Sequence, residues 1–411
     1  MRWCARRWSR MRCRRGGRWV VAGVVLVACS RPVESPEVAA SVAVPGVVRP
    51  PTVAVERPAP VDAVAARLAA ANRLALAEEL LCSYQDASRY PFTSRPIHEH
   101  PDQVHPNRPI VERRAMRARD GARDTTVRVS TGQSRVFMAA GESVELTIAA
   151  AGADGRPLAL EVERAVARGL PGARELVAPQ VALVMEAAGD SQASAVLSPA
   201  ATEFAGFAGT IRTEIHYRVA GLAGVARLDV FYSSEVPATW SGEIREAVED
   251  GSLVFTMTAK VAAPGRYLVS ARVDDARGEP LALLTFNEVL GAGEQDIRLR
   301  MHGRLIHDLK PTFPLRLRDI DAFLLREDAD PDRALMPRRE GEVHVTRTYG
   351  LAEFSDAEWQ SEERTRYLTE MSRDVEQARA ELAELDPGRP GVAFTPDQCR
   401  GFNASVGARQ S

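Results

Sequence analysis

The sequence predicts a mainly β protein, in which two tandem β-sandwiches are flanked by an N-terminal and a C-terminal α-helix. Three observations support this: short runs rich in Val, Leu, Tyr and Phe, a repeated segment among them, and helical spacing of apolar residues on either side. Gly, Pro and Asp separate the runs, as expected between short strands. We expect six segments, 1–28, 29–60, 61–124, 125–236, 237–328 and 329–411.

Residues 1–28 have the composition of a secretory signal peptide. The segment holds eight Arg and no acidic residue, and it ends in the apolar run from Val20 to Ala28. This run is shorter than the roughly 20 apolar residues that a membrane-spanning helix needs. A basic start, a short apolar stretch and small residues at the end are typical of a signal that is removed after export.

The four residues from Leu26 to Cys29 resemble the lipobox of bacterial lipoproteins. The resemblance implies lipidation of the Cys29 thiol, so the chain would be attached to a membrane through a lipid anchor. Ser30, in place of the Asp that marks inner-membrane retention, implies an outer-membrane lipoprotein facing the periplasm or the surface. The alternative is an ordinary cleaved signal followed by an unmodified cysteine.

The charge of the exported chain argues against nucleic acid as a partner. Removing the eight Arg of residues 1–28 takes the formal net charge from −2 to −10. Binding to phosphates requires a clustered basic surface, which such a balance does not favour.

Two cysteines, Cys82 and Cys399, remain once the signal is removed and Cys29 is modified. An oxidising compartment favours a disulfide between them. The chain-entropy relation gives so long a loop roughly 5 to 6 kcal/mol of stabilisation as an upper figure. Two independent thiols are the alternative.

The residues before 125 predict a tether, a helix and a crossing segment. Residues 29–60 are rich in Pro and Val and suit a semi-extended tether. Apolar residues spaced three and four apart then predict an amphipathic helix that ends near Cys82, with the stripe Val61, Val64, Leu68, Ala71 and Ala75. Repeated prolines in residues 83–119 predict an ordered crossing segment or a loop.

The body of the chain reads as a series of short strands. Apolar and polar residues alternate in 144–148 and in 267–273, which predicts strands with one buried face. Other runs predicted as strands are 127–129, 181–185, 211–219, 226–232, 253–260, 281–286 and 297–301.

A repeat links the two halves of this region. Residues 153–160 match residues 276–283 at six of eight positions, and the strand from Val144 falls on the strand from Tyr267 at the same offset of 123. We therefore expect two copies of one immunoglobulin-like sandwich, each near the ~100 residues that such a domain needs.

A second helix follows. Ser355 and Glu358 have the spacing of a capping box. Apolar residues then recur at spacings of three and four before Asp386-Pro387-Gly388 ends the run, and this stripe consists of Leu368, Met371, Val375, Ala378, Leu382 and Leu385. Its expected partner is the helix that ends at Cys82.

One loop could carry chemistry. His98, His100 and His105 stand with two carboxylates within eight residues, which could bind zinc or copper, although a solvated loop is the alternative. The sequence contains no Gly-x-Ser-x-Gly, His-Glu-x-x-His or Walker-type motif. Because catalytic triads are spatial, this absence leaves an enzyme open but disfavours one.

Several segments resemble a family of uncharacterised exported proteins of gammaproteobacteria that carry immunoglobulin-like modules. The resemblance rests on 90–92, 106–109, 264–267, 278–280, 293–295, 303–308 and 313–320. It spans roughly residues 75–330 and implies a fold and an exported address, but no activity. Residues 311–314, Pro-Thr-Phe-Pro, depart from the Asp-Gly-Pro-Tyr usual in that family.

Two functions remain at this point. The first is a non-catalytic envelope lipoprotein that binds another envelope protein or a glycan, with no cofactor, catalytic residue or metal. The second is a metal-dependent hydrolase or metal-binding protein that uses the loop from His98 to His105.

Overall fold

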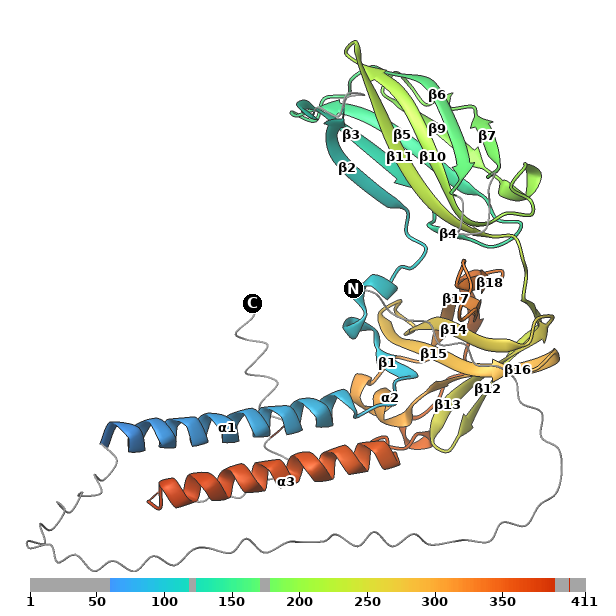
Figure 1. Cartoon of the computed structure of the whole chain (residues 1–411). Helices are drawn as coiled ribbons and strands as arrows, with labels where there is room; N and C mark the ends of the chain where they lie inside the picture. Colours follow the sequence, from blue (N-terminus) through green and yellow to red (C-terminus); the bar gives the residue numbers. More distant parts are fainter. Residues whose placement is uncertain (1–59, 118–122, 171–177, 389–398, 400–411) are drawn as a thin grey trace, which may run out of the picture. The chain divides into compact units, whose positions relative to one another are not determined.

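The computed structural model describes residues 60–117, 123–170, 178–388 and Cys399 (Figure 1). The expected signal, most of the tether and Cys29 lie outside the described residues. The described chain is mainly β, with two β-sandwiches, an N-terminal helix and a C-terminal helix, which confirms the expected fold class. Among the described residues, no helix is long and apolar enough to cross a membrane.

The first sandwich consists of two five-stranded sheets. One sheet has the order β2-β3-β5-β9-β8 and the other β4-β11-β10-β6-β7. Ala220 and Gly221, both with positive φ, form the two-residue turn between β10 and β11 that such hairpins favour. The strands are β2 (Ile110–Arg117), β3 (Arg123–Gln133), β4 (Phe137–Met138), β5 (Val144–Gly152), β6 (Leu160–Gly169), β7 (Gln180–Leu183), β8 (Glu186–Ala187), β9 (Gln192–Leu197), β10 (Ala208–Val219) and β11 (Leu222–Ser233).

The second sandwich packs a three-stranded sheet, β12-β13-β16, against a six-stranded one, β1-β15-β14-β17-β18 with β19 beside β17. Alternate residues point between the sheets, and Phe255, Tyr267 and Leu299 are fully buried there. The elements are β1 (Ser94–Pro96), β12 (Ala238–Glu249), β13 (Ser252–Val261), β14 (Gly265–Asp274), β15 (Pro280–Leu290), β16 (Gly293–Met301), α2 (Gly303–Leu309), β17 (Arg316–Leu325), β18 (Arg333–Leu335) and β19 (Arg339–Val345).

The chain does not complete one sandwich before it starts the next. Strand β1 precedes the first sandwich in the sequence but pairs with β15 of the second, with Ser94 opposite Leu284 (Figure 1). The first sandwich is therefore an insertion between β1 and β12. The sheets also extend past residues 125 and 328, because β2 pairs with β3 and because β18 and β19 pair with β17.

The repeated segments form the same turn. A hydrogen bond from Gly152 N to Arg156 O in the first copy corresponds, at the offset of 123, to one from Asp275 N to Glu279 O in the second. The chains diverge after the turn. The next strand in the first copy, β6, lies in the opposite sheet, whereas β15 pairs with β14 in the same sheet. The repeat thus marks a shared turn and not a shared sheet topology.

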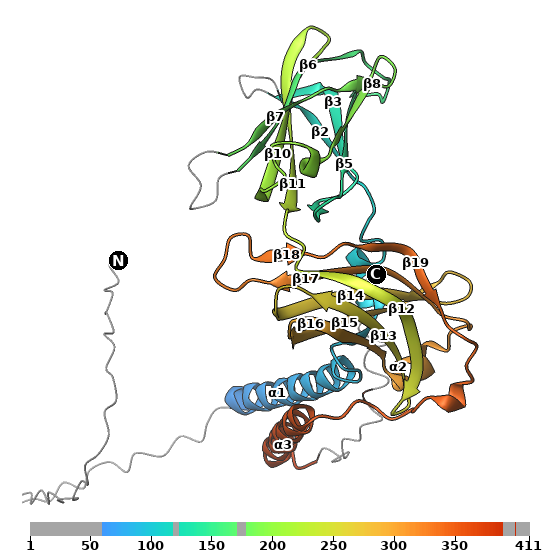
Figure 2. The same cartoon turned by 90° about the vertical axis from the view of Figure 1, so that its right-hand side faces the viewer.

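Helices α1 (Pro60–Ala87) and α3 (Glu362–Leu385) lie side by side, as both views show (Figures 1 and 2). The middle of the predicted stripe on α3 is confirmed, since Val375, Ala378 and Leu382 are buried, whereas its last residue, Leu385, is 38% exposed. Tyr84 and Tyr367 meet edge to face, with ring centroids 5.6 Å apart. The expected pairing of the two helices is therefore present.

The predicted stripe on α1 is wrong. Val64 and Leu68 are 64% and 61% exposed, while Ala70, Leu81 and Cys82 are buried. Ala and Leu occupy every side of this helix, so its sequence contains more than one stripe with helical spacing. Packing against α3 selects the buried one.

The predicted cap of the C-terminal helix is also wrong. Ser361, not Ser355, precedes α3, and its Oγ accepts a hydrogen bond from Arg364 N at 3.0 Å. Ser355 is held instead by the second sandwich, because its backbone N donates to Gly251 O at 2.9 Å. That contact keeps the segment before Ser361 out of the helix.

Candidate ligand-binding cleft

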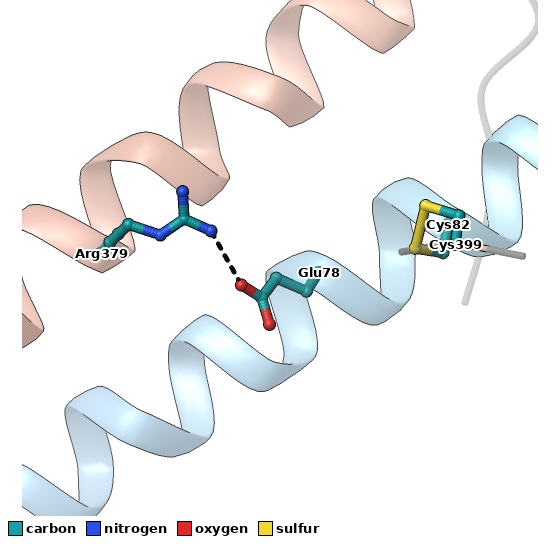
Figure 3. The surroundings of a disulfide bond; sticks show 4 residues. All are labelled: Glu78, Cys82, Arg379 and Cys399. Atoms are coloured by element: carbon teal, nitrogen blue, oxygen red, sulfur yellow. Dashed lines mark hydrogen bonds and ion pairs between the residues drawn. A yellow bond between two sulfur atoms is a disulfide. The ribbon is translucent and has the colours of Figure 1, made fainter. Parts of the chain in front are cut away.

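Cys82 and Cys399 are joined in the structure. Cys82, on α1, and Cys399 form a disulfide with a Cα–Cα distance of 4.9 Å across 317 residues of sequence (Figure 3). One turn away, Arg379 of α3 donates to Glu78 of α1 at 3.0 Å. The disulfide thus reinforces the helix pair and leaves no free thiol on either residue. Cys29 lies outside the described residues.

The histidine loop does not assemble a metal site. His98 lies on a short 3-10 helix, η1 (Ile97–Glu99), and His100 and His105 flank a second one, η2 (Pro101–Gln103). Nowhere in the described chain do three His, Cys, Asp or Glu side chains come together as metal ligands. The arrangement therefore lends no support to the metal-dependent alternative.

This segment has a structural contact that the sequence did not reveal. Gln103 accepts two hydrogen bonds from Arg272 of β14, one at its backbone O (3.1 Å) and one at its Oε1 (2.6 Å). Arg272 is 1% exposed and also donates to Asp321 Oδ2 at 2.7 Å and to Asp319 O at 2.8 Å. The crossing segment is thereby fixed to the second sandwich.

A cavity of about 440 Å³ lies in the first sandwich, between edge strand β2 of one sheet and the part of β11 in the other that is not paired with β4. We call it the inter-sheet cleft. Its lining residues are Glu112, Arg114, Ala115, Val129, Thr131, Tyr217, Val225, Ala226 and Arg227.

Charged residues on the inner face of β2 keep the cleft open. Arg114 and Glu112 lie opposite Val129 and Thr131 in the register with β3. Residues directly opposite each other point to the same side of a sheet, so Arg114 lies on the face of the buried Val129. Arg114 and Glu112 form an ion pair at 2.6 Å and stay at least half exposed. Two apolar residues here would close the sandwich. Burial of a charge pair costs desolvation free energy, so this pair stays exposed.

Tyr217, 1% exposed, contributes a hydroxyl at the floor of the cleft. It stands directly opposite Gly224 of β11, where a Cβ would come within 2.7 Å of the Tyr217 oxygen. Glycine is required there because the ring occupies that space. Burial raises the pKa of Tyr217, so the hydroxyl stays neutral and can both donate and accept.

Arg227 borders the cleft, but its side chain lies on the outer face of the sheet, opposite Glu214 of β10. Its Nε donates to Glu214 of β10 at 2.8 Å, and this hydrogen bond, opposed by partial burial, lowers the pKa of Glu214. The cleft itself presents the Arg114 guanidinium, the Glu112 carboxylate, the Thr131 hydroxyl and the Tyr217 phenol above an apolar floor. This set can bind a polar ligand, but it contains no nucleophile paired with a base.

The sequence revealed only part of this cleft. The β10 and β11 runs were predicted as strands, but β2 lies in the proline-punctuated stretch and was expected to be a crossing segment or a loop. The signal that could have located it is the spacing of Ile110, Glu112 and Arg114, which puts two charges on one face of a short strand.

Comparison with known proteins gives no assignment. No family model and no curated protein matches the chain. Among solved structures, a DUF4785 family protein from Legionella pneumophila has a TM-score of 0.37 and 13% identity over 53% of this chain and 57% of its own. A DUF3823 family protein from Parabacteroides merdae has a TM-score of 0.18 and 14% identity over 46% of this chain and 93% of its own.

Trypsin-activated alpha-2-macroglobulin from Escherichia coli also has a TM-score of 0.18, with 13% identity over 51% of this chain and 15% of its own. The match spans little more than half of the Legionella protein and a small part of the macroglobulin. At these scores the similarity supports no conclusion about function.

Proposed function

We propose that the chain is a non-catalytic lipoprotein of the cell envelope that binds another protein or a glycan in the inter-sheet cleft. The observation that supports this most directly is a cleft kept open by Glu112 and Arg114, with the Tyr217 hydroxyl at its floor. A sandwich with only a structural role would fill this space with apolar side chains.

We further infer that residues 1–28 export the chain and that a lipid on Cys29 anchors it in the outer membrane, facing the periplasm or the surface. The Cys82–Cys399 disulfide supports an oxidising compartment. The resemblance to uncharacterised exported proteins of gammaproteobacteria belongs to the same proposal.

Site-specific photo-crosslinking in intact cells tests the proposed binding. A photoreactive residue at Arg114, inside the cleft, should form a covalent adduct with one envelope protein or with a glycan. The matched control is the same residue at Val196, which is 64% exposed on β9 of the same sandwich. Identical adduct patterns from both positions, or none from Arg114, would contradict the proposal.

A further inference from the structure

We propose that the open edge of β11 binds an extended peptide, which adds to the sheet as a further strand. This inference rests on the proposed function and names the ligand of the same cleft. In such strand addition, the backbone of the sheet edge supplies affinity and the adjoining pocket selects a side chain.

The backbone of β11 has hydrogen-bonding groups available at the cleft. On the side away from β10, Phe231 N donates to Val136 O at 2.7 Å, and Asp229 O accepts from Gln133 Nε2 at 3.2 Å. Backbone groups along a strand alternate in direction with a period of two. The N–H and C=O of Val225 and Arg227 therefore point to the same side, into the cleft.

No other strand of the described chain occupies this part of the edge. Strand β4 pairs with β11 only at Phe231 and Tyr232. Two consecutive odd positions, Val225 and Arg227, thus offer alternating donors and acceptors at the spacing of an extended peptide. Sugar hydroxyls have no such fixed repeat, so the edge favours a peptide over a glycan.

Strand β11 is the better of the two edges around the cleft. An edge strand with inward-pointing charges resists pairing with another strand, and β2 has Glu112 and Arg114 in that position. The residues of β11 that point between the sheets are Gly224, Ala226 and Leu228, which carry no charge. A peptide can therefore add to β11 while the charges of β2 line its other side.

The cleft also limits how many residues of this peptide can pair with β11 and which type of side chain can point inward at one position. Pairing must stop before Asp229, because Gln133 already bonds its carbonyl. An inward side chain near Gly224 would meet the Tyr217 hydroxyl, so we expect Ser, Thr or Asn there. The ligand is thus a short extended segment with one small polar side chain at its centre.

The experiment uses the full chain and a random eight-residue peptide library displayed on phage. We expect selected peptides to bind and to slow amide exchange at Val225 and Arg227. Val225→Pro removes one edge-facing N–H and should weaken binding at least tenfold, whereas Val225→Thr keeps the N–H and should leave it unchanged. Two versions of a selected peptide, N-methylated at the odd or at the even amides, should differ. The version whose methyl groups face β11 should lose binding, and the other should keep it.

The outcomes separate this inference from the proposed function. Peptides that bind without slowing exchange on β11, or that bind Val225→Pro as well as the parent chain, would overturn strand addition. Binding of soluble bacterial oligosaccharides in the cleft, with no peptide selected, would overturn strand addition and uphold the binding function. Loss of every ligand, together with the absence of a crosslink at Arg114, would overturn both.

Discussion

Arg272 shows how one buried residue connects distant parts of the chain. Its guanidinium donates four hydrogen bonds, to Gln103, Asp319 and Asp321. In the sequence, Gln103 precedes the first sandwich, and Asp319 and Asp321 follow it. The charge is desolvated, so it is tolerated only because each nitrogen has a partner.

Arg272→Met should lower the free energy of unfolding by about 3 to 5 kcal/mol, because Asp321 Oδ2, the backbone oxygens of Gln103 and Asp319, and Gln103 Oε1 all lose this donor. Chemical denaturation measures the loss. Arg245→Met is the matched control, because its ion pair with Asp296 is at least half exposed and should contribute less than about 1 kcal/mol. Similar losses in both variants would refute the anchoring role.

Asp275 makes the second copy of the repeated turn sensitive to pH. The residue is fully buried, and although burial opposes its ionisation, hydrogen bonds from Glu279 N, Arg277 N and the Arg277 side chain lower its pKa. A carboxyl whose pKa is lower in the folded chain adds stability above the unfolded value of about 3.9. That stability is lost as the pH falls through the folded pKa.

Asp275→Asn should therefore cost about 1 to 2 kcal/mol at pH 7 and progressively less below pH 4. Unfolding curves of both proteins across this pH range give the difference. Asp154→Asn, in the exposed turn of the first copy, should change stability by less than about 0.5 kcal/mol at any pH. A constant difference for Asp275→Asn would show that its charge is not involved.

At the scale of elements, the start of α3 raises the question of which serine caps the helix, Ser361 or Ser355. Ser361→Ala removes the side-chain acceptor for Arg364 N and should destabilise the chain by about 1 kcal/mol. Ser355→Ala, at the cap that the sequence suggested, should lie within about 0.5 kcal/mol of the parent. Thermal unfolding of the two variants checks the assignment, which fails if Ser355→Ala is the more damaging change.

The clearest of the predicted strands have one buried face. Runs such as 144–148 and 267–273 alternate because one side packs in a core, and they lie in β5 and β14. Strands β1 and β18, with three residues each, are too short to show a period. Strand β2 carries charges on its inner face, so the hydrophobic pattern that identifies a strand is absent from it.

The candidate cleft was hidden from the sequence for the same reason. Tyr217 lay in a predicted strand, but its partnership with Gly224 depends on the register of a hairpin, and the gap beside it depends on β2. A cleft that exists because apolar side chains are missing has no recognisable sequence pattern of its own. The disulfide was different, because elimination left only Cys82 and Cys399 to pair.

At the scale of the whole molecule, sequence order and spatial order differ. The first sandwich interrupts the second, since β1 precedes it and pairs with β15. Helices α1 and α3 come from opposite ends of the described chain and pack together. Local patterns indicated both long helices and several of the strands, but contacts across 200 to 300 residues are not encoded in any local period.

Reduction of the disulfide should lower the free energy of unfolding by about 2 to 5 kcal/mol, because the unfolded chain regains the entropy of a very long loop. Denaturation with and without a reductant measures this loss. The double variant Cys82→Ala, Cys399→Ala should be insensitive to the reductant. Equal sensitivity of both proteins would mean that another group responds.

Cys29→Ala tests the proposed anchor. Cells fed a labelled fatty acid should label the parent chain but not the variant, and the variant should leave the membrane fraction. Cys82→Ala serves as the control, because removal of a structural cysteine should leave labelling intact. Label retained on Cys29→Ala would show that the lipid lies elsewhere.

The helix pair also sets the order in which the molecule can be assembled. Synthesis proceeds from the N-terminus, so α1 is made first, and its packing partner α3 follows only after both sandwiches have been translated. Until then, the apolar side of α1 that includes Leu81 has no cover. A chain truncated before residue 362 would carry two complete sandwiches and an uncovered helix, a form that quality-control proteases could recognise.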